Sequence, residues 1–272
     1  KRKKLADEAE FYKKRTMPAD LERDLRAIDH EIRLQQELLD LKKKEFDTIK
    51  TKYGNEHKCV WVSALQRVNW TKPITTANNC KPIYNWPEKD IVYDKLTTDI
   101  APSLDGGKEW HPMSYSKRTK MVYVPVYDFA MDLQAKKMEW KRGEWYLGAK
   151  VLNFNAGAGH IKAFDAATGK LVWSKSQSYP ATSGILTTGG GLMFYGDPEG
   201  FFNALDDETG EHLWSFNLGT GVYGNPSTYT TGGKQYVAIV YGAGGGGIWP
   251  LHYGEWYKKQ SKGGGLMVFS VE

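Results

Sequence analysis

Apolar residues in the first fifth of the chain recur at alternating steps of four and three positions. The series consists of Leu21, Leu25, Ile28, Ile32, Leu39, Phe46, Ile49 and Tyr53. Gln35 and Lys42 fill the two remaining positions of the same heptad seam. This spacing predicts one long helix over about residues 18–52, with a narrow apolar stripe along one side. Thr16 is placed to cap its N-terminus, and Gly54 is expected to end it.

A helix with so narrow a stripe buries it against another helix or against a neighbouring surface. Three arrangements are open from the sequence. The short segment 4–15 folds back on the helix, a second protein chain binds it in a coiled coil, or the helix packs on the side of its own chain. The first two fit the heptad pattern, and the polar Gln35 and Lys42 would fix the register of a coiled coil.

After residue 58 the helical pattern gives way to short apolar runs separated by glycine-rich turns. The runs at 121–125, 191–197, 201–204, 235–241 and 265–270 are typical of β-strands. Glycine, tryptophan and tyrosine become frequent at the same point. We therefore expect two domains, a helical coiled-coil arm over 1–58 and a mainly β domain over 59–272.

Within the β part, residues 163–173 and 204–214 repeat one pattern with a displacement of 41 positions. In each copy a strand ends in Asp, the motif Asp-x-x-Thr-Gly forms the turn, and a tryptophan, Trp173 or Trp214, lies in the next strand. A period in the low forties is typical of one four-stranded propeller blade. The pattern predicts four to five blades, as a small closed ring or as half of a larger one. The two tryptophans are expected to lie between neighbouring blades.

Composition narrows the function classes further. The net charge is +5 and basic residues alternate with acidic ones, so a nucleic-acid partner is not indicated. No apolar stretch approaches the length of a membrane span. The N-terminal residues do not continue into the apolar segment of a signal peptide. Two cysteines, Cys59 and Cys80, either form one disulfide in an oxidising compartment or remain free thiols.

Several unlike motifs follow one another in the order known from one enzyme family. They lie at 62–64, 68–70, 81–85, 110–116, 121–125, 159–165, 187–192, 223–226 with 228–229, and 236–238. Over residues 60–272 the chain resembles the pyrroloquinoline-quinone (PQQ) dependent alcohol dehydrogenases, which include methanol dehydrogenase. The N-terminal helix has no part in this resemblance.

The resemblance implies the C-terminal half of an eight-bladed ring, with PQQ across the central channel beside calcium or a lanthanide. It implies oxidation of a primary alcohol by hydride transfer to PQQ, in the periplasm, with a cytochrome c-type electron acceptor. The family's metal ligands and its catalytic aspartate precede the matching region. We therefore expect no catalytic and no metal-ligating residue in this chain, and we expect a missing half or a partner chain to supply them.

Five residues match positions near the quinone in the family. Glu109 stands where the family has an asparagine, and Trp110 follows it before His-Pro. Thr182 stands at or beside a position that carries tryptophan or asparagine in the family, and Ser183 and Gly184 match the adjoining turn. His111 is expected to be a buried turn histidine and not a catalytic base. His160, at the start of a strand, is expected to bond a neighbouring loop.

Three functions therefore remain open from the sequence. The chain is a quinoprotein dehydrogenase subunit or fragment, completed by a partner through the helix or the open propeller edge. Alternatively it is a non-catalytic propeller that assembles a complex through its helical arm. The third possibility is a small closed ring that binds peptide or sugar.

Overall fold

A computed structural model describes residues 18–54, 58–84, 90–144, 146, 148–155, 158–243 and 260–270. The chain divides into two compact units, Lys1–Lys58 and Cys59–Glu272. Each unit is considered below by itself, and the second is called the β unit.

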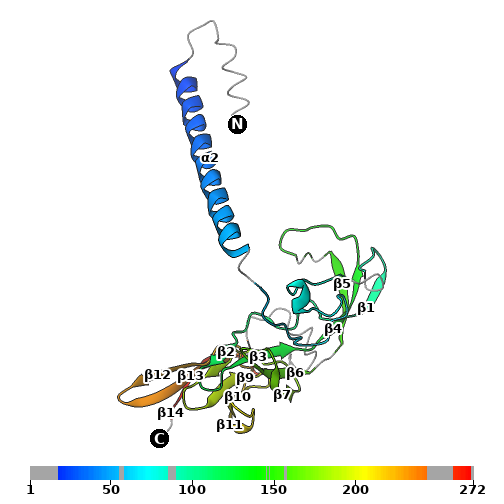
Figure 1. The fold of residues 1–272 in the computed structure, drawn as a ribbon, viewed down its shortest axis with the longest axis vertical. Helices are drawn as coiled ribbons and strands as arrows, with labels where there is room; N and C mark the ends of the chain where they lie inside the picture. Colours follow the sequence, from blue (N-terminus) through cyan, green and yellow to red (C-terminus); the bar gives the residue numbers. More distant parts are fainter. Residues whose placement is uncertain are drawn as a thin grey trace. The chain divides into compact units, whose positions relative to one another are not determined.

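The first unit contains one long helix, α2 (Ala19–Gly54, 36 residues), visible as the blue ribbon in Figure 1. The predicted helix is confirmed, with Asp20 and Glu22 in its first turn, where carboxylates interact favourably with the helix dipole. The predicted cap Thr16 lies outside the described residues. Every side chain from 31 to 48 is exposed, including the apolar stripe. Within the described part of the chain, no helix combines the length and apolarity that crossing a bilayer requires.

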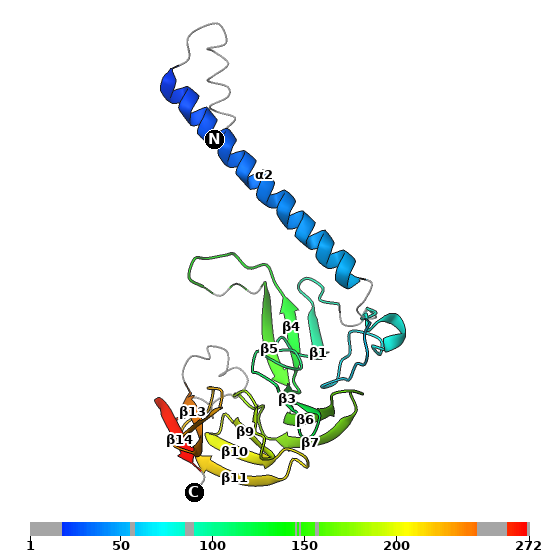
Figure 2. The same cartoon turned by 60° about the vertical axis from the view of Figure 1, so that its left-hand side comes forward.

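Three antiparallel sheets of the β unit follow the chain as meanders (Figure 2). The first, sheet A, contains β2 (Ser114–Ser116), β3 (Met121–Tyr127), β6 (Gly159–Asp165) and β7 (Leu171–Gln177). Sheet B contains β8 (Leu186–Thr187), β9 (Leu192–Gly196), β10 (Phe201–Asp206) and β11 (His212–Asn217). Sheet C contains β12 (Ser227–Thr231), β13 (Lys234–Gly242) and β14 (Gly264–Ser270). These propeller-like sheets confirm the predicted fold class.

A fourth sheet interrupts the meander of sheet A. In this sheet β4 (Ala130–Ala135) pairs with β1 (Leu96–Ile100) on one side and with β5 (Ala149–Asn155) on the other. Both β4 and β5 lie between β3 and β6 in the sequence. A short 3-10 helix, η1 (Thr76–Asn78), precedes β1. Among the described residues, the 41-residue pattern occurs in two of the four sheets, A and B, and sheet C follows them along the chain without a copy of it. The sequence prediction did not identify this excursion.

The Asp-x-x-Thr-Gly turns have the same hydrogen bonds in both copies. Asp165 Oδ1 accepts the amide of Thr168 at 2.8 Å and its hydroxyl at 2.7 Å, and Asp206 Oδ1 accepts the same groups of Thr209 at 2.8 and 3.0 Å. These donors hold the pKa of both carboxyl groups below the ordinary value. The turn predicted from the repeat is therefore confirmed at the level of single hydrogen bonds.

The glycine that ends each turn lies against a tryptophan ring from another part of the chain, Gly169 against Trp61 and Gly210 against Trp173. Gly169 and Gly210 have φ values of +71° and +74°, a region that favours glycine. A Cβ on Gly169 would lie 2.3 Å from the ring of Trp61, and one on Gly210 would lie 2.8 Å from Trp173. The prediction that Trp173 lies between blades is confirmed. Trp61, from a segment that forms no strand, covers the turn of sheet A in a similar way, although the repeat did not reveal it.

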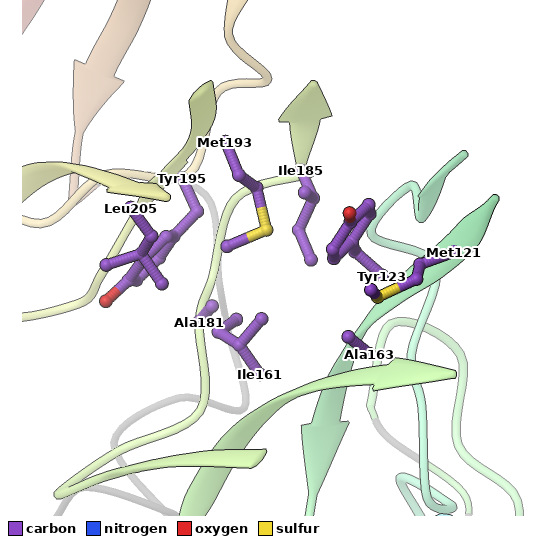
Figure 3. Packing of buried hydrophobic residues seen from close by; sticks show 9 residues of the cluster. All are labelled: Met121, Tyr123, Ile161, Ala163, Ala181, Ile185, Met193, Tyr195 and Leu205. Carbon is purple, nitrogen blue, oxygen red and sulfur yellow. The ribbon is translucent and has the colours of Figure 1, made fainter. Parts of the chain in front are cut away.

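Side chains from sheets A and B form one continuous core between the two sheets. Figure 3 shows nine of them, with Ile185 beside Tyr123, Leu205 beside Tyr195, and Met193 between these two pairs. A second cluster joins sheets B and C, where Phe202 of β10 packs on Phe269 of β14 with ring centroids 5.8 Å apart. Each sheet is thus fastened to the next mainly by apolar burial.

Cys59 and Cys80 form a disulfide that closes a segment of 21 positions at the start of the β unit. This settles the alternative that the sequence left open. A cross-link over such a segment lowers the entropy of the unfolded chain, which corresponds to a stabilisation of about 3 kcal/mol.

We expect the double variant Cys59→Ser/Cys80→Ser to lose about 3 kcal/mol of unfolding free energy. Urea denaturation of the variant and of the wild type, each with and without reductant, measures this. Reductant should lower the stability of the wild type to that of the variant and leave the variant unchanged. A variant as stable as the oxidised wild type would contradict the assignment.

Candidate functional site

The segments that lead into the first strands of sheets A, B and C lie next to one another. The amide of Ile185 donates to the carbonyl of Pro112 at 3.0 Å, which joins the approach to β8 to the approach to β2. The amide of Gly184 donates to Asn225 Oδ1 at 2.8 Å, which joins it to the approach to β12. Ser114 and Thr187, in β2 and β8, are linked through their hydroxyl groups at 2.7 Å. The structure therefore brings the two predicted groups, Glu109 with Trp110 and Thr182 to Gly184, into one region.

Thr182 and Ser183 are fully buried and their hydroxyl groups are used within the protein. Thr182 Oγ1 donates to the carbonyl of Val222 at 2.6 Å. Ser183 Oγ donates to the carbonyl of Gly184 at 2.9 Å and accepts the amide of Gly196 at 2.6 Å. Thr182 therefore joins the approach to sheet B to the approach to sheet C, and Ser183 joins the approach to β8 to the end of β9 within sheet B.

Gly184 has no room for a side chain, because a Cβ there would lie 2.6 Å from Asn225 Oδ1 and 2.9 Å from Pro112 Cδ. The junction therefore depends on close backbone approach at this position. Any contact that this turn makes with a ligand is expected to come from its backbone.

Glu109 and Trp110 lie at the accessible side of the junction. The Trp110 indole is 63% exposed and stacks on the His111 ring with centroids 4.2 Å apart. Lys108 Nζ donates to the carbonyl of Glu109 at 2.7 Å, and partial burial lowers the pKa of Lys108, opposed by the charge of Glu109. The segment 108–110 thus presents a cation, a carboxylate and an aromatic face next to one another.

His111 is fully buried beneath Trp110 and hydrogen-bonds to the hydroxyl of Tyr127 through Nδ1 at 3.0 Å. Burial, with a smaller contribution from the charge of Lys108, lowers its pKa to about 4. The imidazole is therefore neutral at pH 7 and supports the ring of Trp110. His160 is half-buried, with Nε2 3.8 Å from a carboxylate oxygen of Asp128, and burial also lowers its pKa.

The buried His111 makes the folding stability of the β unit depend on pH. Because its pKa is lower in the folded protein than the ordinary 6.5, the unfolded state binds more protons, and stability falls as the pH decreases from about 6.5 toward 4. We expect protonation linked to His111 to lower the free energy of unfolding by about 2 to 3 kcal/mol when the pH falls from 7.5 to 4.5. Urea unfolding at both pH values should show a smaller loss for His111→Gln than for the wild type. The exposed His212 provides the control variant, and an equal loss in all three proteins would contradict the assignment.

Within the described residues, no three histidine, cysteine, aspartate or glutamate side chains are grouped as metal ligands would be. The side chains at the junction offer one carboxylate, Glu109, beside the cation Lys108. This set does not fit calcium or a lanthanide, which require six or more oxygen ligands. No chemical step is therefore assigned to a metal held by this chain.

Residues 175–237 match the family model described as "Glucose/ethanol/alcohol dehydrogenase, beta-propeller domain" (PQQ). The chain is also 40% identical over 179 residues to the quinoprotein alcohol dehydrogenase PedH of Pseudomonas putida, which covers 63% of this chain and 30% of that protein. The β unit is homologous to the quinoprotein alcohol dehydrogenases. Methanol dehydrogenase [cytochrome c] subunit 1 of Paracoccus denitrificans is 34% identical over 228 residues, 75% of this chain and 36% of that subunit. The chain spans about a third of the length of these quinoprotein relatives.

Solved quinoprotein structures agree with the fold of the β unit. A europium-containing methanol dehydrogenase matches with a TM-score of 0.65 and 32% identity, over 75% of this chain and 40% of that one. The quinohemoprotein alcohol dehydrogenase from Comamonas testosteroni matches with a TM-score of 0.62 and 30% identity, over 77% of this chain and 31% of that one. The resemblance predicted from the sequence is confirmed.

Lys108 and Asn225 belong to the junction and were not among the predicted site residues. Asn225 lies in the matched segment 223–226, so the resemblance could have identified it. Lys108 precedes Glu109 directly, but a lysine after two glycines is typical of an exposed loop. Only the structure shows that it is partly buried beside the candidate site.

Proposed function

We propose that this chain is a subunit or the C-terminal part of a PQQ-dependent alcohol dehydrogenase that oxidises a primary alcohol. The observation that supports it best is the junction of segments 108–113, 182–185 and 222–226 in a chain homologous to quinoprotein dehydrogenases. In this proposal the catalytic base and the metal ligands come from a missing half or a partner chain. PQQ supplies the hydride acceptor when bound, with calcium or a lanthanide held by the other part.

The chain's own contribution is to hold one side of the quinone. The exposed indole of Trp110 offers a flat surface for stacking, and buried His111 supports that ring from below. Lys108 would attract the carboxylates of the quinone, and Glu109 would accept a hydrogen bond from a protonated group. Thr182, Ser183 and Gly184 would act through backbone groups, because both of the hydroxyl groups are already used.

The open side of sheet C suits a partner. Among the described residues β14 pairs only with β13, and it exposes Leu266 and Val268. Between sheets B and C a groove of about 480 Å³ is lined by Trp214, Phe202 and Phe269. We propose that the remaining part of the propeller completes this edge and covers the groove.

The proposed location is the periplasm. The Cys59–Cys80 disulfide is typical of proteins from an oxidising compartment. The name of the Paracoccus denitrificans relative couples methanol dehydrogenase to cytochrome c, and a cytochrome c-type protein is the proposed electron acceptor here.

A second candidate is a non-catalytic propeller that acts as an assembly subunit through its helical arm. It is favoured by Glu109, a hydrogen-bond acceptor where the family has an amide that can also donate. It is also favoured by Thr182 and Ser183, whose hydroxyl groups are already bonded within the chain. The two candidates differ in whether quinone is bound in the intact assembly.

The test is an absorption spectrum and a mass spectrum of the assembly purified from its natural host. The dehydrogenase proposal predicts quinone absorbance together with a longer polypeptide or a second chain. Trp110→Leu should weaken quinone retention at least about tenfold, while Trp140→Leu, at a 69% exposed tryptophan outside the junction, should not. A second chain without quinone would favour the assembly subunit.

A further inference from the structure

The apolar stripe of α2 is exposed over the middle of the helix. Ile32, Leu39 and Phe46 are 44%, 55% and 65% exposed, and Leu38, beside the stripe, is 56% exposed. Toward the N-terminal end Leu25 and Ile28 are half-buried. An exposed stripe of this length on a helix of 36 residues is typical of an interaction surface.

We propose that this surface binds the same surface of a second copy of the chain, with the two helices antiparallel and crossing at residue 37. The coiled-coil partner left open by the sequence is then another copy of α2. The inference rests on α2 alone and does not depend on the proposed quinone chemistry.

The heptad positions decide the direction. With residue 37 at the centre, Ile28 lies opposite Phe46 of the second copy, Ile32 opposite Lys42, and Gln35 opposite Leu39. Each polar seam residue thus meets an apolar one. The stem of Lys42 can pack on Ile32 of the second copy while its ammonium group reaches the carboxylates of Asp29 and Glu31 there. Two parallel helices would instead place Lys42 against Lys42 and Gln35 against Gln35 inside the seam.

The positions flanking the seam favour the same direction. In the antiparallel pair Asp29 faces Lys43 of the second copy on one side, and Leu38 faces Leu38 at the centre of the other side. Glu31 faces Glu45, an unfavourable pair that the neighbouring Lys42 offsets. In a parallel pair Asp24 would face Asp29, and Leu38 would face Lys43.

The first test is the oligomeric state of the 272-residue chain by sedimentation velocity over a range of concentrations. We expect a dimer for the wild type. Leu38→Asp should weaken it at least about tenfold, because two carboxylates then meet at the centre. Leu34→Asp is the matched control, since Leu34 is also exposed (51%) but lies away from the seam, and it should leave the dimer unchanged.

Several results would overturn the proposal. A monomeric wild type at all concentrations would mean that α2 has no self-association. A dimer unaffected by Leu38→Asp would place the contact elsewhere on the chain. A dimer strengthened by Leu38→Asp would indicate parallel helices, because the new carboxylate would then face Lys43.

Cross-linking with a short bismaleimide tests the direction independently, because Cys59 and Cys80 are joined and an introduced thiol is free to react. Gln36→Cys should cross-link efficiently, since the two positions lie nearly level at the crossing. Lys42→Cys should not, because the antiparallel arrangement separates these positions by about 15 Å along the axis. Efficient cross-linking of Lys42→Cys with none at Gln36→Cys would exclude the antiparallel pair.

Discussion

Replacing Gly169 with alanine is expected to lower the unfolding free energy of the β unit by about 2 to 5 kcal/mol. Two costs add at this position. An alanine at φ +71° costs about 1 to 2 kcal/mol because of its backbone conformation. The new methyl group would lie 2.3 Å from the ring of Trp61 and would displace it, together with the bond from its Nε1 to the carbonyl of Ala166 at 3.0 Å.

A matched variant separates the two costs. Gly219 has a φ of +82° and no atom within 4 Å of a built Cβ, so Gly219→Ala carries the backbone cost alone, about 1 to 2 kcal/mol. Urea unfolding followed by circular dichroism measures both variants. Equal losses for Gly169→Ala and Gly219→Ala would mean that Trp61 does not hold the turn.

Replacing Asp207 with alanine is expected to lower the free energy of unfolding by about 2 to 4 kcal/mol. Asp207 is fully buried, where it accepts the hydroxyl of Ser116 at 3.0 Å and forms an ion pair with the guanidinium of Arg118. It comes from the turn after β10, and its partners come from β2 and the turn that follows. The carboxylate therefore fastens sheet B to sheet A.

The repeat shows that this aspartate is not needed for the turn itself, because the corresponding residue of the first copy is Ala166. Glu208→Ala is the matched control. Its side chain is 64% exposed and also contacts Arg118, at 3.0 Å, so its removal should change the stability little. If both variants unfold at the same urea concentration as the wild type, the link between the sheets has no energetic importance.

The repeat made much of the β unit predictable from the sequence. Local residue types determine the turns at Asp165 and Asp206, the strands around them and the position of Trp173. A short sequence pattern is therefore enough to predict these features. The excursion β4–β5 was missed because it separates β3 from β6, which pair with each other across more than thirty residues. Such a pairing leaves no local signal. The partner of Trp61 was missed for the same reason, since its ring reaches Gly169 from far along the chain.

The candidate site was predictable only in part. The resemblance indicated Glu109, Trp110, Thr182, Ser183 and Gly184, and the structure brings their two segments together. It could not show that the hydroxyl groups of Thr182 and Ser183 are occupied, because their acceptors, the carbonyls of Val222 and Gly184, are backbone groups. Backbone acceptors have no signature in the sequence. The disulfide was likewise undecided, because two cysteines 21 positions apart fit both alternatives.

We propose that this chain holds one side of a quinone site and depends on another part for the catalytic base and the metal ligands. Alcohol-dependent dye reduction by the 272-residue chain, with PQQ and either calcium or a lanthanide added, tests this dependence most directly. We expect no turnover above the level without alcohol. Sustained alcohol-dependent turnover by this chain alone would show that it needs no other part.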